Sequence, residues 1–208
     1  MSCWALVPVK RRGEGKRRLA GHLSAPERLQ LIRHMLAQTI AALRQTQGLD
    51  GIAFVSAERD TIPREFLVLD DPGGGPNAAL AAARADLAAR GATALVVVAA
   101  DLPRLTGPDL DALITAGRRT GFALAPDAAG TGTNALYLPA QPAFEFHFGP
   151  GSRTLHLAEA QRLGLEATLV ERPGLAFDLD DPEDLDRMRV HNECRYTPQP
   201  PGPETPAA

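Results

Sequence analysis

Short apolar runs alternate along this chain with longer segments in which apolar residues recur every three or four positions. The run at 93–100, TALVVVAA, is apolar almost throughout, which is typical of a strand buried on both faces of a parallel sheet. Further strand candidates lie at 5–9, 51–56, 65–69, 122–125, 134–138 and 168–170. Because helical patterns separate most of these strands, the sheet is predicted to be mostly parallel.

Capping residues mark several of the predicted helices. Ser24 with Glu27, and Thr106 with Asp109, each place an acidic residue three positions after a hydroxyl residue, as in a capping box. Gly91 follows an alanine-rich stretch as its stop signal. Helices are thus predicted after Ser24, at 77–90, 106–119 and 152–163, and from Pro182; the first has Leu29, Ile32, Leu36, Thr39, Ile40 and Leu43 on one face. The predicted fold class is α/β, with three layers around a mostly parallel central sheet.

The bulk composition fits one folded domain in the cytoplasm. The 208 residues are 44% apolar and 23% charged, and the net charge of −3 gives no reason to expect nucleic acid as a partner. At 195–208, five prolines and few large apolar residues predict a disordered tail behind a domain at 1–194. We expect no membrane partner, because no apolar run approaches the roughly 20 residues that span a bilayer and the N-terminus lacks a signal-peptide pattern. Cys3 and Cys194 are interpreted as free thiols.

Two glycine-containing loops follow strands, on the side where parallel sheets bind ligands. Residues 10–18 follow the first strand, and six of these nine residues are basic, which favours a loop that grips a triphosphate. The loop at 70–77, DDPGGGPN, leads into a helix, where backbone N–H groups could meet a base, a sugar or a phosphate. A solvated surface turn is the alternative interpretation of either loop.

Three aspartates point to a cation site. Asp101 ends the buried run at 93–100, where a carboxylate is costly unless it is paired or holds a metal ion. Asp178 and Asp180 alternate along an extended segment and so share one side of it, where either could meet Asp101 around a cation. The alternatives are a turn role for Asp101 and N-capping of the last helix by Asp180 or Asp181.

Two loops of small residues predict a pocket for a second anion. Residues 127–134, DAAGTGTN, and 148–153, FGPGSR, are rich in hydroxyl and N–H donors. Ser152 is expected to cap a helix whose N-terminus attracts an acidic group, although ordinary turns would explain either loop. No metal-ligand spacing or catalytic triad is indicated by the five histidines, which are interpreted as surface or structural: His22, His34, His147, His156 and His191.

The chain resembles the CofC/FbiD guanylyltransferases of coenzyme F-420 biosynthesis over nearly all of residues 4–190. The matching segments are PVK…GKRRLA (8–20), GGGPNAAL (73–80), VVAADLPRLT (97–106), APDAAGTGTNAL (125–136), FGPGS (148–152) and FDLDDPEDL (177–185). The Asp-x-Pro element is shared by the wider MobA-like nucleotidyltransferases. The resemblance implies a Rossmann-like nucleotidyltransferase fold of the GT-A type. It also implies transfer of GMP from GTP to phosphoenolpyruvate, 3-phospho-D-glycerate or 2-phospho-L-lactate, with release of pyrophosphate.

The resemblance also assigns roles to individual residues. The catalytic residues would be Lys16, Asp101 and Asp180, with Mg²⁺ held by Asp101, Asp180 and Asp178. GTP would contact Lys10, Arg18, Gly75 and Asn77, and the phosphorylated acid would contact Thr133, Gly149 and Ser152. The acceptor phosphate is largely anionic at neutral pH, so we expect it to attack GTP without a general base.

Alternatives to this function remain open at the level of sequence. A transferase of the same fold could act on a molybdopterin or a sugar acid, and a protein of another class could bind a nucleotide without catalysis. The sequence also leaves open whether the chain forms a homodimer and whether a downstream transferase accepts the labile product. The composition favours phosphoenolpyruvate or 3-phosphoglycerate over phospholactate.

Overall fold

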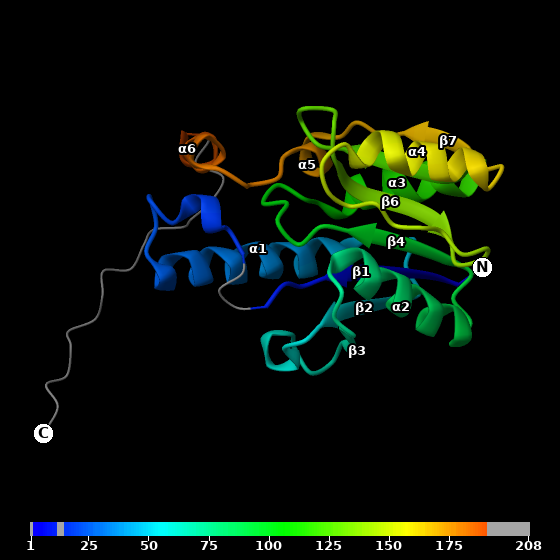
Figure 1. The fold of residues 1–208 in the computed structure, drawn as a ribbon, viewed down its shortest axis with the longest axis horizontal. Coiled ribbons are helices and arrows are strands. Elements are labelled where there is room, and N and C mark those ends of the chain that lie inside the picture. Colours follow the sequence, from blue (N-terminus) through cyan, green and yellow to red (C-terminus); the bar gives the residue numbers. More distant parts are fainter. Residues whose placement is uncertain (1, 12–14, 191–208) are drawn as a thin grey trace, which may run out of the picture.

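The computed structural model describes residues 2–11 and 15–190, and Figure 1 shows a central sheet with helices on both faces. The strands are β1 (Cys3–Pro8), β2 (Gly51–Ser56), β3 (Leu67–Asp70), β4 (Ala94–Val98), β5 (Gly121–Pro126), β6 (Thr133–Pro139) and β7 (Glu166–Leu169). The α-helices are α1 (Ala25–Gln45), α2 (Pro76–Ala89), α3 (Gly107–Thr120), α4 (Ser152–Arg162), α5 (Pro173–Ala176) and α6 (Pro182–Val190). Two 3-10 turns, η1 (Arg17–Leu19) and η2 (Arg59–Thr61), complete the described elements.

The seven strands have the spatial order β3-β2-β1-β4-β6-β5-β7. All neighbouring pairs are parallel except the two that involve β6, which runs antiparallel to both β4 and β5. A short connection at 127–132 joins β5 to β6, and such a hairpin requires antiparallel strands. β6 therefore begins at the edge where β4 ends. The mostly parallel α/β sheet predicted from the sequence is confirmed.

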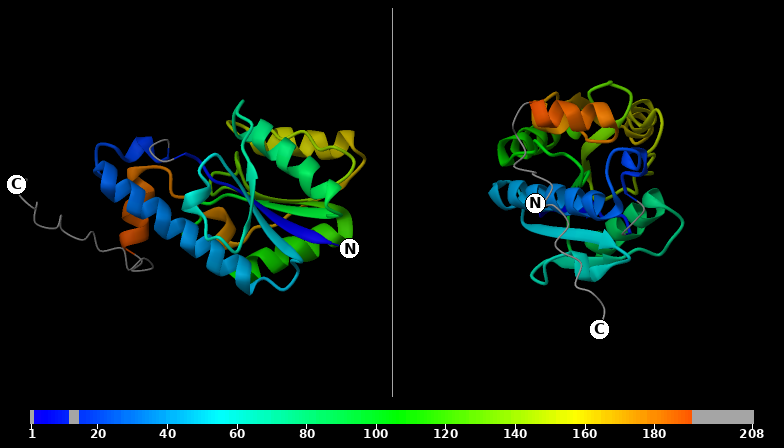
Figure 2. Two further views of the ribbon diagram at one scale, coloured as in Figure 1. Left: turned by 90° about the horizontal axis from the view of Figure 1, so that it is seen from below. Right: turned by 90° about the vertical axis from the view of Figure 1, so that its left-hand side faces the viewer.

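Alternating side chains on the strands feed two separate cores. One face of the sheet packs against α1, α3 and α5, and the other packs against α2 and α4. A third, smaller core lies beyond the sheet, where η1 and the first half of α1 meet the segment before α6 and α6 itself (Figure 2). Its members are Leu19, Leu23, Leu31, Met35, Phe177, Leu179, Leu185 and Met188. This core joins η1 and the first half of α1 to α6 and the segment before it.

Several local predictions can be compared with the structure. Both capping boxes are confirmed, at Ser24 and at Thr106. Ser152 was expected to be the N-cap of α4, but that expectation is wrong: Gly151 holds the position, with a left-handed φ of 70°, and Ser152 is the first helical residue. Leu29 and Ile32 lie toward a cavity instead of the sheet core, because the first half of α1 extends past the sheet.

Some sequence predictions lie outside the described residues or touch them only in part. The predicted tail at 195–208 lies outside them, as do His191 and Cys194. Residues 12–14 of the predicted triphosphate loop also lie outside the described residues. Within 2–11 and 15–190, no helix combines the length and the apolar character needed to cross a bilayer.

Candidate active site

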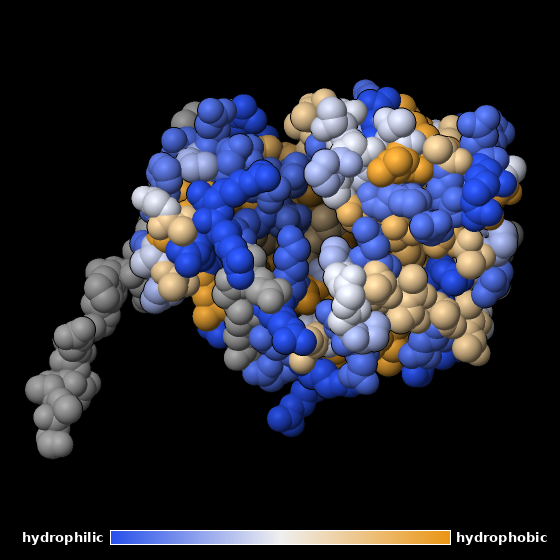
Figure 3. Space-filling view, viewed as in Figure 1, coloured by the Kyte–Doolittle hydropathy of each residue, from blue (hydrophilic) through white to orange (hydrophobic). Residues whose placement is uncertain are grey.

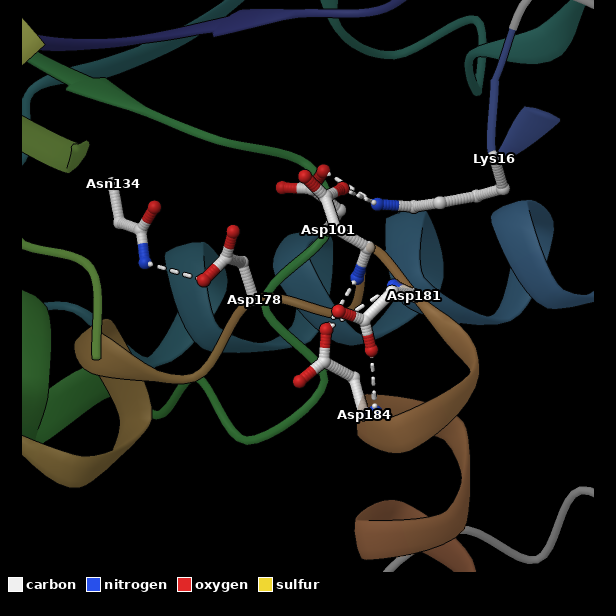
Figure 4. Close-up of polar contacts among 7 residues, drawn as sticks. Lys16, Asp101, Asn134, Asp178, Asp181 and Asp184 are labelled. Atoms are coloured by element: carbon white, nitrogen blue, oxygen red, sulfur yellow. Dashed lines mark hydrogen bonds and ion pairs between the residues drawn. The ribbon is translucent and has the colours of Figure 1, made fainter. Parts of the chain in front are cut away.

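Lys16 joins two aspartates that lie far apart in the sequence. Its Nζ atom is 2.7 Å from Oδ2 of Asp101 and 2.8 Å from Oδ1 of Asp180. Asp101 follows β4, whereas Asp180 precedes α6. Figure 4 shows the lysine side chain reaching toward Asp101 from the first loop. The carboxylates of Asp101 and Asp180 thus lie close together, on the Lys16 ammonium. Their binding of a metal ion stays a prediction.

The backbone of Lys16 has an unusual conformation. Its φ of 56° is left-handed, which is rare for a residue that is not glycine and typically marks a constrained position. The side chain is 6% exposed. Burial alone would lower the pKa of the ammonium group, but Asp101 and Asp180 outweigh burial and raise the pKa above its ordinary value. Lys16 is therefore charged at neutral pH.

Asp180 owes its position to the segment that precedes it. Leu179 is buried in the third core, and its N–H donates to the backbone oxygen of Asp101 at 3.2 Å. The capping of α6 falls to Asp181, whose Oδ1 accepts from the N–H of Asp184 at 3.0 Å. The alternative of N-capping therefore applies to Asp181. The pKa of Asp180, which burial alone would raise, is lowered by Lys16 and by the more distant charges of Lys10 and Arg18.

Asp178 lies beside this pair, between Asn134 and Asp101 (Figure 4). Asn134 donates from its Nδ2 atom to Asp178 at 3.4 Å and, more closely, to the backbone oxygen of Leu175 at 2.9 Å. Burial and the charges of Asp101 and Asp180 raise the pKa of Asp178, although the hydrogen bond from Asn134 opposes this effect. Burial and the two acidic neighbours thus disfavour the charged form of Asp178.

A cavity of about 370 Å³ opens beside Lys16 and the two aspartates, and Figure 3 shows the molecule hollowed near the middle of this face. The end of β1, the first half of α1, the start of α2 and residues 99–101 supply its walls. The predicted site residues among its lining are Lys10, Lys16, Asp101, Gly149 and Asp180. The cavity therefore joins the predicted triphosphate loop to the predicted metal ligands.

The other residues predicted for GTP are not among those that line this cavity. Gly75 is the N-cap of α2 with a φ of 92°, a conformation that glycine adopts readily, and Arg18 is exposed on η1. The side-chain amide of Asn77 is engaged at both ends: it accepts from the N–H of Phe148 at 2.8 Å and donates to its carbonyl at 3.1 Å. Asn77 therefore holds the 148–152 loop against α2, and its side chain is not directed freely toward a nucleotide.

The two loops predicted for a second anion meet at the start of α4. The N–H of Arg153 donates to the carbonyl of Thr131 at 3.2 Å, and its guanidinium donates to the carbonyl of Gly130 at 2.9 Å. Ser152 is buried close by, and Thr133 begins β6 with its hydroxyl 3.0 Å from His156. Gly149 has a φ of 141°. Thr133, Gly149 and Ser152 are thus brought into one region, although their contact with an acceptor remains a prediction.

Two residues that contribute to this arrangement received no functional role from the sequence. Asn134 links β6 to the segment that carries Asp178, and it lies within the GTGTNAL segment that carried the resemblance. His156 was interpreted as surface or structural; it is fully buried, and its ring contacts Thr133. No local sequence signal identifies either contact, because the partners are more than 20 residues away.

A second group of possible metal ligands lies near α4. One ligand atom each from Glu145, His147 and Glu159 falls within 4.8 Å of the others, a grouping that the histidine spacing did not reveal. The carboxylate of Glu159, however, already accepts from Arg162 at 2.6 and 2.7 Å and from the N–H of Glu145 at 2.8 Å. These contacts explain its buried position without a metal ion.

The fold is similar to that of nucleotidyltransferases of known structure. The structure is similar to a nucleotidyl transferase from Methanothermobacter thermautotroptrophicus, with a TM-score of 0.63, 19% identity, and coverage of 91% of this chain and 97% of that one. It is also similar to Rv0371c of Mycobacterium tuberculosis H37Rv in complex with manganese (TM-score 0.53, 18% identity, 90% and 97% coverage).

The sequence defines the family. The family described as "Guanylyl transferase CofC like" matches residues 3–199, and the chain belongs to it. The phosphoenolpyruvate guanylyltransferase of Rubrobacter xylanophilus is 40% identical over 204 residues, which cover 96% of this chain and 99% of that relative. The protein is therefore an enzyme, a guanylyltransferase, and the resemblance predicted from the sequence is confirmed.

Proposed function

We propose that the enzyme transfers GMP from GTP to phosphoenolpyruvate in coenzyme F-420 biosynthesis, with Mg²⁺ as its metal ion and pyrophosphate as the second product. The observation that carries this proposal is the convergence of Asp101 and Asp180 on one cation beside the cavity. The name of the Rubrobacter xylanophilus relative supports the choice of acceptor.

A divalent metal ion fits this pair of carboxylates. The Lys16 ammonium already holds one positive charge within hydrogen-bonding distance of both, so the two side chains can share a cation. Carboxylate oxygens are hard ligands of the kind that Mg²⁺ and Mn²⁺ prefer, and Asp178 is a candidate third ligand. When bound, the ion would neutralise charge on the triphosphate and the departing pyrophosphate. The manganese complex of a fold neighbour agrees with a divalent ion.

The two proposed substrates would contact different sets of residues. Lys10, Lys16 and Arg18 would contact the GTP phosphates, and Gly75 and Asn77 would lie at the nucleotide side. The phosphorylated acid would contact Thr133, Gly149 and Ser152. The positive end of α4 and the N–H groups of the glycine-rich loop favour an anion at that place.

The reaction requires two anions to approach each other. A phosphate oxygen of the acceptor attacks the α-phosphorus of GTP, and the new bond forms as the bond from that phosphorus to the bridging oxygen breaks. Pyrophosphate leaves with the bonding electron pair. The acceptor phosphate has a second pKa near 6 and is already largely anionic at neutral pH, so no side chain needs to remove a proton. The protein contributes positive charge and in-line positioning, which can supply several kcal/mol.

The test is to offer phosphoenolpyruvate, 3-phospho-D-glycerate and 2-phospho-L-lactate separately, each with GTP and Mg²⁺, and to measure pyrophosphate release. We propose that a downstream transferase accepts the labile product, so that adding this transferase traps the product for identification by mass. We expect phosphoenolpyruvate to react fastest. Faster release with either other acid would refute the proposed acceptor, and equal release with ATP or CTP would refute the preference for GTP.

A further inference from the structure

His156 is a buried histidine whose ring contacts Thr133, one of the residues predicted to bind the acceptor. It lies on α4, is 0% exposed, and its ring centroid is 4.8 Å from that of Phe148 and 5.8 Å from that of Phe144. Both of its ring nitrogens are engaged. The Nε2 atom is 2.9 Å from the backbone nitrogen of His147, and the Nδ1 atom is 3.0 Å from the hydroxyl of Thr133.

These contacts determine which nitrogen carries the proton. A backbone N–H can only donate, so Nε2 of His156 must accept from His147 through its lone pair. Burial and the nearby His147 lower the pKa of His156 to about 4, which keeps the ring neutral at pH 7. The single ring proton therefore resides on Nδ1, which donates to the Thr133 oxygen.

The tautomer in turn determines what the Thr133 hydroxyl can do. A hydroxyl has one proton to donate, and the interaction with Nδ1 uses an oxygen lone pair and leaves that proton available. Among the described residues, no further hydrogen bond of the Thr133 hydroxyl is found. Thr133 lies 7% exposed at the carboxyl edge of the sheet, next to the loop that contacts the start of α4. The hydroxyl hydrogen of Thr133 can therefore be donated to an anion at this edge.

We propose that His156 is a positioning residue that makes the Thr133 hydroxyl an obligate hydrogen-bond donor to the phosphorylated acid. This inference rests on the proposed function, because it requires the acceptor to bind beside Thr133. A hydroxyl that could rotate freely would offer the anionic acceptor a lone pair for part of the time, and that orientation is repulsive. Fixing the donor orientation stabilises the bound acceptor without affecting GTP.

The test compares two substitutions that retain different halves of the imidazole. His156→Asn places an amide near the position of Nδ1 and can still donate to Thr133, whereas His156→Gln places its amide near Nε2 and keeps only the contact to His147. We expect His156→Gln to raise the KM for phosphoenolpyruvate by up to roughly tenfold, the upper end of what one hydrogen bond between uncharged groups contributes. The KM for GTP and kcat should stay within about twofold, and His156→Asn should recover most of the acceptor affinity.

Two further measurements separate positioning from a general packing role. In a Thr133→Val background, His156→Gln should add almost nothing to the KM of the acceptor, because the two residues act through one hydrogen bond. In the wild type, the ¹⁵N spectrum of the ring should report a protonated Nδ1. If His156→Gln does not fold, the ¹⁵N spectrum of the wild-type ring still tests the tautomer, and His156→Asn, which keeps a donor to Thr133, should retain acceptor affinity.

The outcomes are distinct. A protonated Nε2, equal rises in both KM values, or additive effects in the double variant would each overturn the role of His156 while the proposed function stands. A wild-type enzyme that uses none of the three acids would overturn both.

Discussion

Replacement of Lys16 by methionine should tighten the binding of Mn²⁺ to the enzyme in the absence of GTP. In the structure, the ammonium group of Lys16 occupies the position of a cation between Asp101 and Asp180. A metal ion that binds these carboxylates before GTP arrives must therefore displace the lysine. Methionine keeps most of the aliphatic side chain and removes the charge, so it removes the competitor with little change in packing.

The expected magnitude follows from the exposure of the two ion pairs. Lys16 is 6% and Asp101 is 28% exposed, so their contact resembles a partly buried charged hydrogen bond, worth about 1.5 kcal/mol. Asp180 is 51% exposed, and its contact is worth only about 0.5 kcal/mol because water screens it. Their sum of about 2 kcal/mol corresponds to a roughly 30-fold decrease in the Kd for Mn²⁺. Turnover should fall at the same time, because the triphosphate loses a cation.

Free Mn²⁺ can be followed by its electron paramagnetic resonance signal during titration of the GTP-free protein near pH 7. Because the pKa of Lys16 is raised above its ordinary value of 10.5, the competition should persist across neutral pH and weaken only when the pH rises through that elevated pKa. Arg33→Met is the matched control, since Arg33 lines the same cavity from α1. It should change the Kd by less than about threefold, the effect of a distant charge in water.

A Kd for Mn²⁺ in Lys16→Met equal to or higher than that of the wild type would refute the competition. That result would mean that the carboxylates of Asp101 and Asp180 do not form the metal site. Equal tightening in Lys16→Met and Arg33→Met would also refute it, because the effect would then be one of net charge.

Three further predictions concern individual residues of the site. Asp101→Asn should abolish pyrophosphate release and leave the fold intact by circular dichroism; turnover like that of the wild type would contradict a metal role. Ser152→Ala should raise the KM of the acceptor more than that of GTP, and equal changes in steady-state assays would remove Ser152 from the acceptor pocket. Stability should decrease as the pH falls from about 6.5 toward 4, because His156 stays neutral in the fold down to about 4 while the unfolded chain takes up a proton. The contribution of His156 to the free energy of unfolding reaches about 3 kcal/mol, and the charges of His147 and Glu159 also act on its pKa. Urea unfolding that shows the same dependence of stability on pH in His156→Gln would contradict this prediction.

Features carried by one stretch of sequence could be predicted. The buried run that becomes β4 identified the centre of the sheet, and Asp101 stood out because it ends that run. Asp180 was predicted with two competing roles, metal binding and capping. The structure separates the roles because Asp181 makes the capping contact and leaves Asp180 to meet Lys16. The capping boxes are also local, and both were predicted correctly.

Features that depend on contacts between distant segments could not be predicted. The partner of Asn77 is Phe148, 71 residues later, and the amide that the sequence assigned to GTP is used in that contact. The ion-pair partners of Lys16 lie 85 and 164 residues later, and the composition of the basic loop does not reveal them. The N-cap of α4 is Gly151 instead of Ser152, because the chain turns there through a positive φ that glycine tolerates more readily.

Two asparagines hold together segments that carry predicted site residues. Asn77 holds the predicted acceptor loop against the helix that begins at the predicted nucleotide loop. Asn134 holds the segment bearing Asp178 against the strand that begins with Thr133. An amide side chain can both donate and accept, so Asn77 fixes the Phe148 peptide at both its N–H and its carbonyl, which a charged side chain could not do. Because neither residue needs a charge, the loops can be held together without altering the balance of charge between two anionic substrates and the carboxylates of the site.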